Sequence, residues 1–411
     1  MLMDRNKEWV MNEIEKIAHF GKGPRGITRL AFTETAVEAQ KYVISLMEQV
    51  GLTITIDQIG NIIGRLEGKD DSLPAVVTGS HLDTVPEGGK YDGVIGVIGG
   101  LVAISRLKDK EGLTHPLELI IFACEESSRF GFATVGSKAM VGLANVPEWR
   151  KAKDQEGVSF AEVIAKQHLD IERIGEAVRN AEEIKAFVEL HIEQGRVLEK
   201  EQKTIGIVEA IAAPTRLKIR VEGVAAHSGS TPMEERRDAL VSASMIVLAI
   251  HEIGAEQSKY GTVTTVGMLN VYPGAINVIP GVVEMWVDIR GVNHESIIEC
   301  LQDIKDAIST IAEGQEIGVS IMLLSAEKPI NMNKDIMGLI KKVCVEKKVP
   351  HQVIHSRAGH DAMNLSHLAP AGMIFVPSQN GISHNGEEHT AIDEIMSGID
   401  VLTETLFQLA K

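Results

Sequence analysis

Histidine and acidic side chains follow several apolar segments of the sequence, each at the point where the segment ends. Imidazole and carboxylate groups together suit Zn²⁺, Mn²⁺, Co²⁺ or Ni²⁺, whereas Ca²⁺ prefers oxygen ligands alone. A glycine-rich segment, GGKYDGVIG, adds a further acid. The residues concerned are His81 and Asp83 in GSHLDTV, Asp92 in GGKYDGVIG, Glu125 and Glu126 in CEESSRF, His191 in ELHIEQG, and His384 and His389 in NGISHNGEEH. Their types predict a metal centre.

The number of candidate ligands is sufficient for two ions. Five of them would hold two ions if Asp92 bridges the pair, and these are His81, Asp92, Glu126, His191 and His384. Two ions about 3.5–4 Å apart can share a hydroxide and polarise a carbonyl group. Glu125 would then be free to move protons, and His389 competes with His384 as a ligand. Each residue alone has an ordinary explanation, since an isolated histidine is usually structural and Asp before Gly usually forms a turn.

The elements that must position these residues are continuous apolar strands. Residues 75–80, 117–124, 185–192 and 371–378 have this character, and helical stretches alternate with the first three. Unbroken apolar strands are typical of a mainly parallel sheet that helices cover on both faces. Ligands of open α/β sheets bind at the carboxyl ends of the strands. We therefore expect the candidate ligands to meet at one edge of one sheet.

The pattern of apolar and polar residues is different in the middle of the chain. Alternating or β-rich segments predict strands at 215–223, 261–271, 282–290 and 317–324, and apolar periodicity predicts helices at 233–257 and 294–314. The order β-α-β-β-α-β is that of a ferredoxin-like sandwich. We predict an inserted α+β domain at 212–325, between a first part of the catalytic domain at 1–211 and a second part at 326–411.

Length, composition and charge limit the class of protein. A chain of 411 residues with 44% hydrophobic and 24% charged residues predicts two globular domains. A net charge of −16 argues against nucleic acid or anionic membrane as a partner. Apolar runs such as 119–124 are too short to span a membrane. The N-terminal MLMDRNKEWVMNEIEK is interpreted as a charged amphipathic helix rather than a signal peptide, which predicts a cytoplasmic protein.

The three cysteines agree with a reducing compartment, because they are widely spaced and form no CxxC motif. Cys124 precedes the acidic pair, and we interpret it as a small apolar residue at the end of a buried strand.

Nine segments of the sequence together resemble the amidase/hydantoinase/carbamoylase family of dinuclear metallohydrolases. They are GSHLDTV, YDGVIGV, EESSRF, ELHIEQGRVLE, AAHSGSTPMEERRDAL, INVIPG, VDIR, AGHDA and GISHN, and the resemblance runs from residue 27 to the C-terminus. Two positions depart from the family. Arg357 stands where glycine is common, which leaves the size and charge of the substrate pocket open. Gly386 stands where proline is common, and we expect it to loosen a turn.

The resemblance assigns roles to individual residues. It implies metal ligation by His81, Asp92 as the bridge, Glu126, His191 and His384, and it favours His384 over His389. Glu125 would act as general base and then as general acid, while Asp83 would orient His81. The inserted domain would serve as a lid and as the interface of a homodimer. It would carry His227, which would stabilise the oxyanion within its own subunit or across the dimer. The substrate would be held by Gln194, Asn277 and Arg290, with the region of Gly359 closing the pocket.

The resemblance also implies an activity, which is hydrolysis of the carbamoyl C–N bond of N-carbamoyl-L-amino acids to the amino acid, CO₂ and ammonia. Two divalent ions per subunit are expected, either Zn²⁺ or Mn²⁺, with Co²⁺ and Ni²⁺ as further options. Allantoate and β-ureidopropionate are alternative small ureido-acid substrates. A peptidase of the wider superfamily and a binding protein without catalysis are the remaining alternatives.

Overall fold

The computed structural model describes residues 6–411 of the chain. The chain divides into two compact units, which are the residues up to Glu209 together with Asn331–Lys411, and the segment Ala210–Ile330. The first helix, α1, spans Lys7–His19, and Asn6 caps it by accepting a hydrogen bond from the backbone N–H of Trp9. The predicted N-terminal helix therefore exists from Lys7 onward, and residues 1–5 lie outside the described part of the chain.

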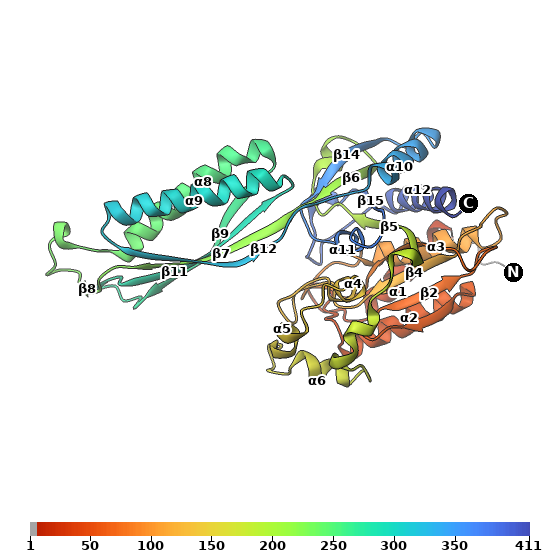
Figure 1. Ribbon diagram of the computed structural model, residues 1–411, viewed down its shortest axis with the longest axis horizontal. Coiled ribbons are helices and arrows are strands. Elements are labelled where there is room, and N and C mark those ends of the chain that lie inside the picture. Colours follow the sequence, from red (N-terminus) through yellow and green to blue (C-terminus); the bar gives the residue numbers. More distant parts are fainter. Residues whose placement is uncertain (1–5) are drawn as a thin grey trace. The chain divides into compact units, whose positions relative to one another are not determined.

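A nine-stranded sheet forms the centre of the first unit, and its middle strands are parallel (Figure 1). The strand order is β1-β2-β4-β3-β5-β15-β6-β13, with β14 paired to β6. Parallel pairing joins β4 to β3, β3 to β5 and β5 to β15, as predicted, whereas β1, β2 and β6 pair antiparallel with their neighbours. The strands are β1 (Thr53–Ile56), β2 (Ile62–Leu66), β3 (Ala75–His81), β4 (Leu117–Phe122), β5 (Ile184–Ile192), β6 (Ile205–Ile211), β13 (Ile330–Asn331), β14 (His351–Ser356) and β15 (Ala371–Val376).

Helices cover both faces of this sheet, which is why the central strands are apolar throughout. The main hydrophobic core lies between the sheet and one layer of helices, formed by α1, α2 (Glu34–Val50), α3 (Val94–Leu107), α10 (Lys334–Glu346) and α12 (Ile392–Ala410). Two short helices, α4 (Val135–Met140) and α11 (Asp361–Leu365), contact β4, β5 and β15, and α4 adds a smaller core with α5 (Val146–Lys151) and α6 (Phe160–Ala165).

Replacing Ile98 with alanine should destabilise the first unit strongly. Ile98 lies in α3, at the centre of the main core, and its side chain is fully buried. We expect the free energy of unfolding to fall by about 2–5 kcal/mol, because the change removes buried methyl groups and leaves a cavity. Urea unfolding measures the loss. The same substitution at Ile298, a half-exposed helical position, is the control and should change stability by less than about 0.5 kcal/mol.

The second unit is a four-stranded antiparallel sheet with two helices side by side along it (Figure 1). Its strands lie in the order β12-β7-β11-β9, and the element order along the chain is the β-α-β-β-α-β that the sequence indicates. A separate pairing joins the short strands β8 (Ala226–His227) and β10 (Val278–Ile279). The main elements are β7 (Ala213–Glu222), α8 (Ala239–Gln257), β9 (Val263–Tyr272), β11 (Val282–Gly291), α9 (His294–Gly314) and β12 (Gly318–Ala326).

The helix expected from residue 233 begins later than the sequence pattern suggests. Residues Met233–Glu235 form a separate 3₁₀ turn after Pro232. α8 starts at Ala239 because the carboxylate of Asp238 accepts hydrogen bonds from the backbone N–H groups of Leu240 and Val241. Such an N-cap satisfies N–H groups that the first turn of a helix leaves unpaired.

One stretch of the described chain, Ala239–Tyr260, is long and apolar enough to cross a membrane, with a mean hydropathy of 1.5. The continuous apolar runs considered in the sequence analysis, such as 119–124, did not reveal this longer apolar stretch. Ala243, Ile246 and Ile250 from this stretch are buried in the core of the second unit, where they pack with the sheet. Only 33% of the apolar window is buried, and Val241, Met245 and Leu248 of the same helix are exposed, so packing in this core accounts for part of its apolar composition.

Candidate metal centre

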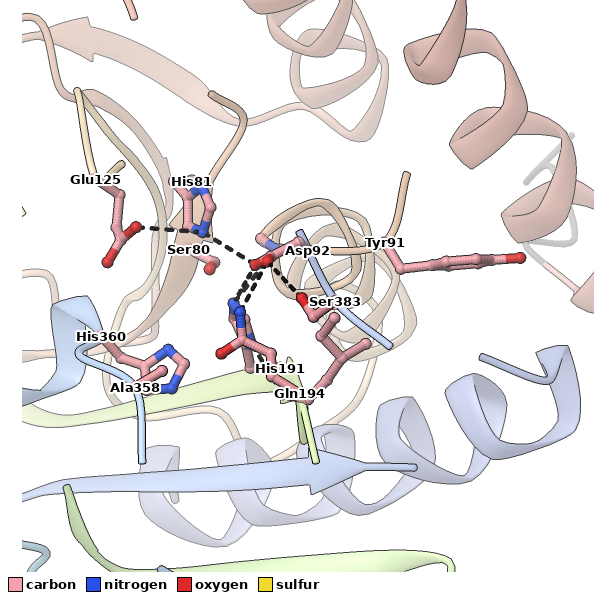
Figure 2. A network of polar contacts seen from close by, with 12 residues as sticks. Ser80, His81, Tyr91, Asp92, Glu125, His191, Gln194, Ala358, His360 and Ser383 are labelled. Carbon is pink, nitrogen blue, oxygen red and sulfur yellow. Dashed lines mark hydrogen bonds and ion pairs between the residues drawn. The ribbon is translucent and has the colours of Figure 1, made fainter. Parts of the chain in front are cut away.

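The candidate ligands meet at the carboxyl edge of the central parallel strands. Figure 2 shows three of them, His81, Asp92 and His191. His81 is the last residue of β3, and His191 lies one residue before the end of β5. Glu126 follows β4, and His384 lies in the loop after β15. Asp92 precedes α3, so it reaches the same edge from the loop between β3 and that helix. The structure thus brings all five predicted ligands together.

Asp92 lies between the other four candidates, and each of its oxygens faces a different pair. Its Oδ1 is 3.1 Å from Nε2 of His191 and 3.6 Å from Nε2 of His81. Its Oδ2 is 3.3 Å from Nε2 of His384, which is itself 3.2 Å from Oε1 of Glu126. Two sets of potential ligands therefore share one carboxylate, and within each set the ligand atoms lie within 4.8 Å of one another.

The histidines on the β3 and β5 strands present the correct nitrogen to this centre. Nδ1 of His81 donates to the backbone carbonyl of Asp83 over 2.9 Å, and Nδ1 of His191 donates to the carbonyl of Ile192 over 3.0 Å. These bonds keep a proton on Nδ1 of each ring, so that Nε2, which faces Asp92, is the nitrogen whose lone pair would bind a metal once its own proton is lost.

Hydrogen bonds from the histidines to the carboxylates connect the side chains of the centre. Burial opposes ionisation of Asp92, yet hydrogen bonds from His191, His384 and His81 outweigh it and hold the pKa of Asp92 well below its usual range. Hydrogen bonds to Asp92 and Glu126 raise the pKa of His384 to about 10. A divalent cation would replace these protons, because metal ligation needs neutral imidazole and ionised carboxylate. The donor set therefore fits divalent metal ions.

The backbone is strained where the site is built. Gln194 and His384 have φ values of 56° and 54°, in the left-handed region that non-glycine residues rarely adopt. Gly93 has a φ of 68°, and an added Cβ would lie 2.6 Å from the ring of His81. Such strain persists where the surrounding structure fixes a functional geometry. At Gly93 only glycine allows the Asp92 loop to approach His81 this closely.

Glu125 lies beside the centre without belonging to either ligand set. Its Oε2 is 3.8 Å from Nε2 of His81, and the side chain is almost fully buried (Figure 2). Burial raises the pKa of Glu125 well above its ordinary value, and the charge of Glu126 acts in the same direction. A carboxyl group with a raised pKa next to a metal centre is suited to accept and return a proton.

Asp83 has a different contact from the one predicted. Its carboxylate oxygen Oδ1 is 3.8 Å from Nδ1 of His81, so the main-chain carbonyl of Asp83 is the group that orients this ring. The carboxylate instead accepts hydrogen bonds from the backbone N–H groups of Glu125, over 3.2 Å, and Glu126, over 3.0 Å. Asp83 consequently positions the acidic pair as well as His81.

Gln194 contacts the centre directly. Its Nε2 donates to Oδ2 of Asp92 over 2.8 Å, whereas its Oε1 is buried and has no hydrogen-bond partner among the described residues. The exposed Gly359 lies in the loop before α11. His389 is exposed, with Nδ1 3.3 Å from the hydroxyl of Tyr91, and it belongs to neither ligand set in residues 6–411. This geometry favours His384 as the ligand.

The predicted residues of the second unit do not all lie together. His227 pairs with Val278 in the β8–β10 ladder, and the N–H of Ser228 donates to the carbonyl of Asn277, so His227 and Asn277 are neighbours. Arg290 lies near the other end of β11, where its Nε donates to Asp288. The β11 segment between Val282 and Arg290 spans roughly 25 Å at the rise of an extended strand.

Gly386 lies close to the backbone of residues 25 and 26. An added Cβ would lie only 2.1 Å from the backbone oxygen of Arg25 and 2.8 Å from Cα of Gly26. The absence of a side chain therefore lets the loop that carries His384 pack directly against residues 25 and 26.

The sequence analysis did not identify three buried residues at the site, which are Glu189, His360 and Glu388. His360 stacks edge-on against His191 with ring centroids 4.5 Å apart, and with Glu189 and His191 it forms a third potential metal-binding set. Burial holds the pKa of His360 well below its ordinary value, so the ring is neutral. Burial, with the charge of Asp92, raises the pKa of Glu388 to about 7. The AGHDA motif held a signal for His360, whereas Glu388 in GEEH is indistinguishable from a solvated acid.

Comparisons with known proteins give a consistent result. Residues 77–408 match the model of peptidase family M20/M25/M40. The chain is 38% identical to an N-carbamoyl-L-amino acid amidohydrolase of Geobacillus stearothermophilus, covering 98% of each chain. It is 36% identical to an allantoate amidohydrolase of Escherichia coli, covering 96% of each. The crystal structure of a hydantoinase/carbamoylase family amidase from Burkholderia multivorans superposes with a TM-score of 0.89 at 34% identity, covering 98% of each chain.

Proposed function

The chain belongs to peptidase family M20/M25/M40, and from this premise we propose that it hydrolyses the carbamoyl C–N bond of N-carbamoyl-L-amino acids. It is an amidohydrolase that acts on a non-peptide C–N bond, as its relatives are. The proposal depends above all on one observation, which is that Asp92 joins two ligand sets beside a buried glutamate, Glu125.

Two divalent ions, Zn²⁺ or Mn²⁺, are proposed as cofactors. His81 and His191 would hold one ion, Glu126 and His384 would hold the other, and Asp92 would serve both. When bound, such ions polarise the carbamoyl oxygen and lower the pKa of a water molecule toward neutrality.

Glu125 is the proposed proton carrier. It would take the proton of the attacking water and deliver it to the leaving nitrogen. Ammonia and a carbamate result, and the carbamate decomposes to CO₂ and the amino acid. The raised pKa of Glu125 supports this role, because a carboxyl group that holds its proton more tightly than usual is better able to take a proton from water before delivering it to the leaving nitrogen.

The second unit is proposed to act as a lid and to form a homodimer. A small ureido acid cannot span the roughly 25 Å of β11 that separates Arg290 from the neighbourhood of His227 and Asn277. If all three residues bind one substrate, the two groups must come from different subunits. Arg290 would clamp the substrate carboxylate, for which a guanidinium is well shaped, and His227 would stabilise the oxyanion from the other subunit. Gln194, with its unpaired amide oxygen, would bind the ureido group.

Allantoate is the second candidate substrate, because a relative of similar identity is an allantoate amidohydrolase. Both candidates are small ureido acids with a carboxylate, so the same residues would bind either.

The three cysteines are free and buried, which supports the proposal of a cytoplasmic enzyme.

A substrate panel tests this function. The enzyme loaded with Mn²⁺ or Zn²⁺ should release ammonia from N-carbamoyl-L-methionine with a higher kcat/KM than from allantoate or β-ureidopropionate. N-carbamoyl-D-methionine is the matched control and should react poorly. A higher kcat/KM for allantoate would show that the amino-acid assignment is wrong. If the metal-loaded enzyme released ammonia from none of these compounds, the proposed ureido-acid hydrolysis would fail altogether.

A further inference from the structure

Glu388 lies beneath the Asp92 loop, and the mechanism assigns it no role. The side chain is only 3% exposed. Its Oε1 accepts hydrogen bonds from two successive backbone N–H groups, over 2.9 Å from Tyr91 and 3.1 Å from Asp92. The carboxylate therefore holds the main chain of the residue that both ligand sets share.

The second oxygen of Glu388 reaches the loop that carries His384. Oε2 is 3.0 Å from Oγ of Ser383, the residue directly before His384. Oγ of Ser383 is in turn 3.1 Å from Oδ2 of Asp92, a contact that Figure 2 shows. Glu388, Ser383 and Asp92 thus form a closed ring of contacts, which joins the loop before α3 to the loop after β15. These two loops supply the facing ligands Asp92 and His384.

Gly89 provides the space that this arrangement needs. A Cβ added at Gly89 would lie 2.1 Å from Oε1 and 2.2 Å from Cδ of Glu388. Its φ is not in the left-handed region, so the backbone itself would accept alanine. The need for glycine at this position therefore comes from the carboxylate of Glu388.

We propose that Glu388 is a positioning residue that fixes Asp92 and His384 relative to each other, so that the two can bind the same metal ion. This inference rests on the metal centre of the proposed function but on no particular substrate. Without the carboxylate, the buried N–H groups of Tyr91 and Asp92 lose their acceptor, and Ser383 loses one of its two contacts. The distance between Asp92 and His384 would then be free to vary, which lowers the affinity for the ion that these two residues would share.

Metal binding measured by calorimetry on the full chain tests the proposal. Glu388→Ala should lower the affinity for one of the two Mn²⁺ ions, the one that Asp92 and His384 share, by about 10–100-fold, the usual effect of losing a partner that orients a ligand. Glu388→Gln should retain most of the affinity, because the amide oxygen can still accept from Tyr91 and Asp92. Glu387→Ala, at the exposed neighbouring residue, is the matched control and should leave the affinity unchanged.

Gly89→Ala is an independent test, because it displaces the Glu388 side chain without removing it. It should lower the affinity as much as Glu388→Ala does. The double variant should add little to either single change, since residues that act through one contact are not additive.

Wild-type affinity in Glu388→Ala would overturn the proposal. So would an equal loss in Glu388→Ala and Glu388→Gln, because the hydrogen-bonding oxygen would then be irrelevant. The proposed hydrolysis fails separately, if the wild-type protein binds two ions but releases no ammonia from any ureido acid.

Discussion

Glutamine in place of Glu125 is expected to lower kcat by about 10²–10⁴-fold, the usual contribution of a positioned general acid–base group. Glutamine has nearly the same size, so the buried side chain still fits. It cannot accept a proton from water or return one to the leaving nitrogen. Glu125 lies outside both ligand sets, and the variant should therefore still bind two ions per subunit. Steady-state ammonia release and metal content after dialysis provide the two measurements.

Glu126→Gln is the informative comparison. Glu126 is the residue next to Glu125 and undergoes the same chemical change, but it contacts a metal-ligand candidate. Its Oε1 lies 3.2 Å from Nε2 of His384, within a ligand set. This variant should lose affinity for one ion, and added metal should restore part of its activity. Added metal should not rescue Glu125→Gln. If excess metal restored Glu125→Gln, or if that variant kept its activity, Glu125 would be a ligand or a bystander rather than the proton carrier.

The strand-end ligands could be predicted from the sequence because the geometry of a parallel sheet is regular. Residues at or just after the carboxyl ends of β3, β4 and β5 must lie at the same edge, so His81, Glu126 and His191 converge whatever the details of packing. The continuous apolar segments that identify those strands are equally visible in the sequence. The mostly parallel sheet and the family are both confirmed.

Residues whose role depends on burial could not be predicted in the same way. Glu388 and Glu387 are adjacent acids in a polar loop, yet the first is buried under Asp92 and the second is exposed. Nothing in their sequence context separates them, because the loop packs against residues nearly 300 positions away. The contact of His360 with His191 likewise joins the loop before α11 to a strand far away in the sequence, although the AGHDA motif held a signal for His360 itself. The start of α8 also shifted, because Asp238 was not distinguished as the cap from the other charged residues before it.

The residues of the second unit show a different limit of sequence reasoning. The motifs indicated that Asn277 and Arg290 hold the substrate and that His227 stabilises the oxyanion, and motif order contains no distance. The strand β11 places Arg290 far from the other two within one unit. A motif can therefore identify residues that serve one reaction while leaving open which subunit supplies each of them.

Replacement of Asp92 by asparagine is expected to remove most metal binding and with it the activity. One carboxylate faces both ligand sets, through Oδ1 toward His191 and through Oδ2 toward His384. Asparagine keeps the shape but lacks the negative charge and one of the two oxygens, so it cannot join two cations. We expect metal content to fall from two ions to below one per subunit. The loss of several kcal/mol of charge stabilisation corresponds to a fall of about 10³-fold or more in kcat/KM.

The pattern of loss distinguishes a bridge from an ordinary ligand. His81→Ala and Glu126→Gln should each lower the affinity for one ion and leave the other ion bound. Asp92→Asn should lower the affinity for both ions. Asp109→Asn, an exposed position after α3, is the control for the chemical change and should keep full metal content. Loss of a single ion in Asp92→Asn would mean that Asp92 belongs to one set only. The two ions would then be held by separate ligand sets, and the proposal that one carboxylate serves both ions would have to be replaced.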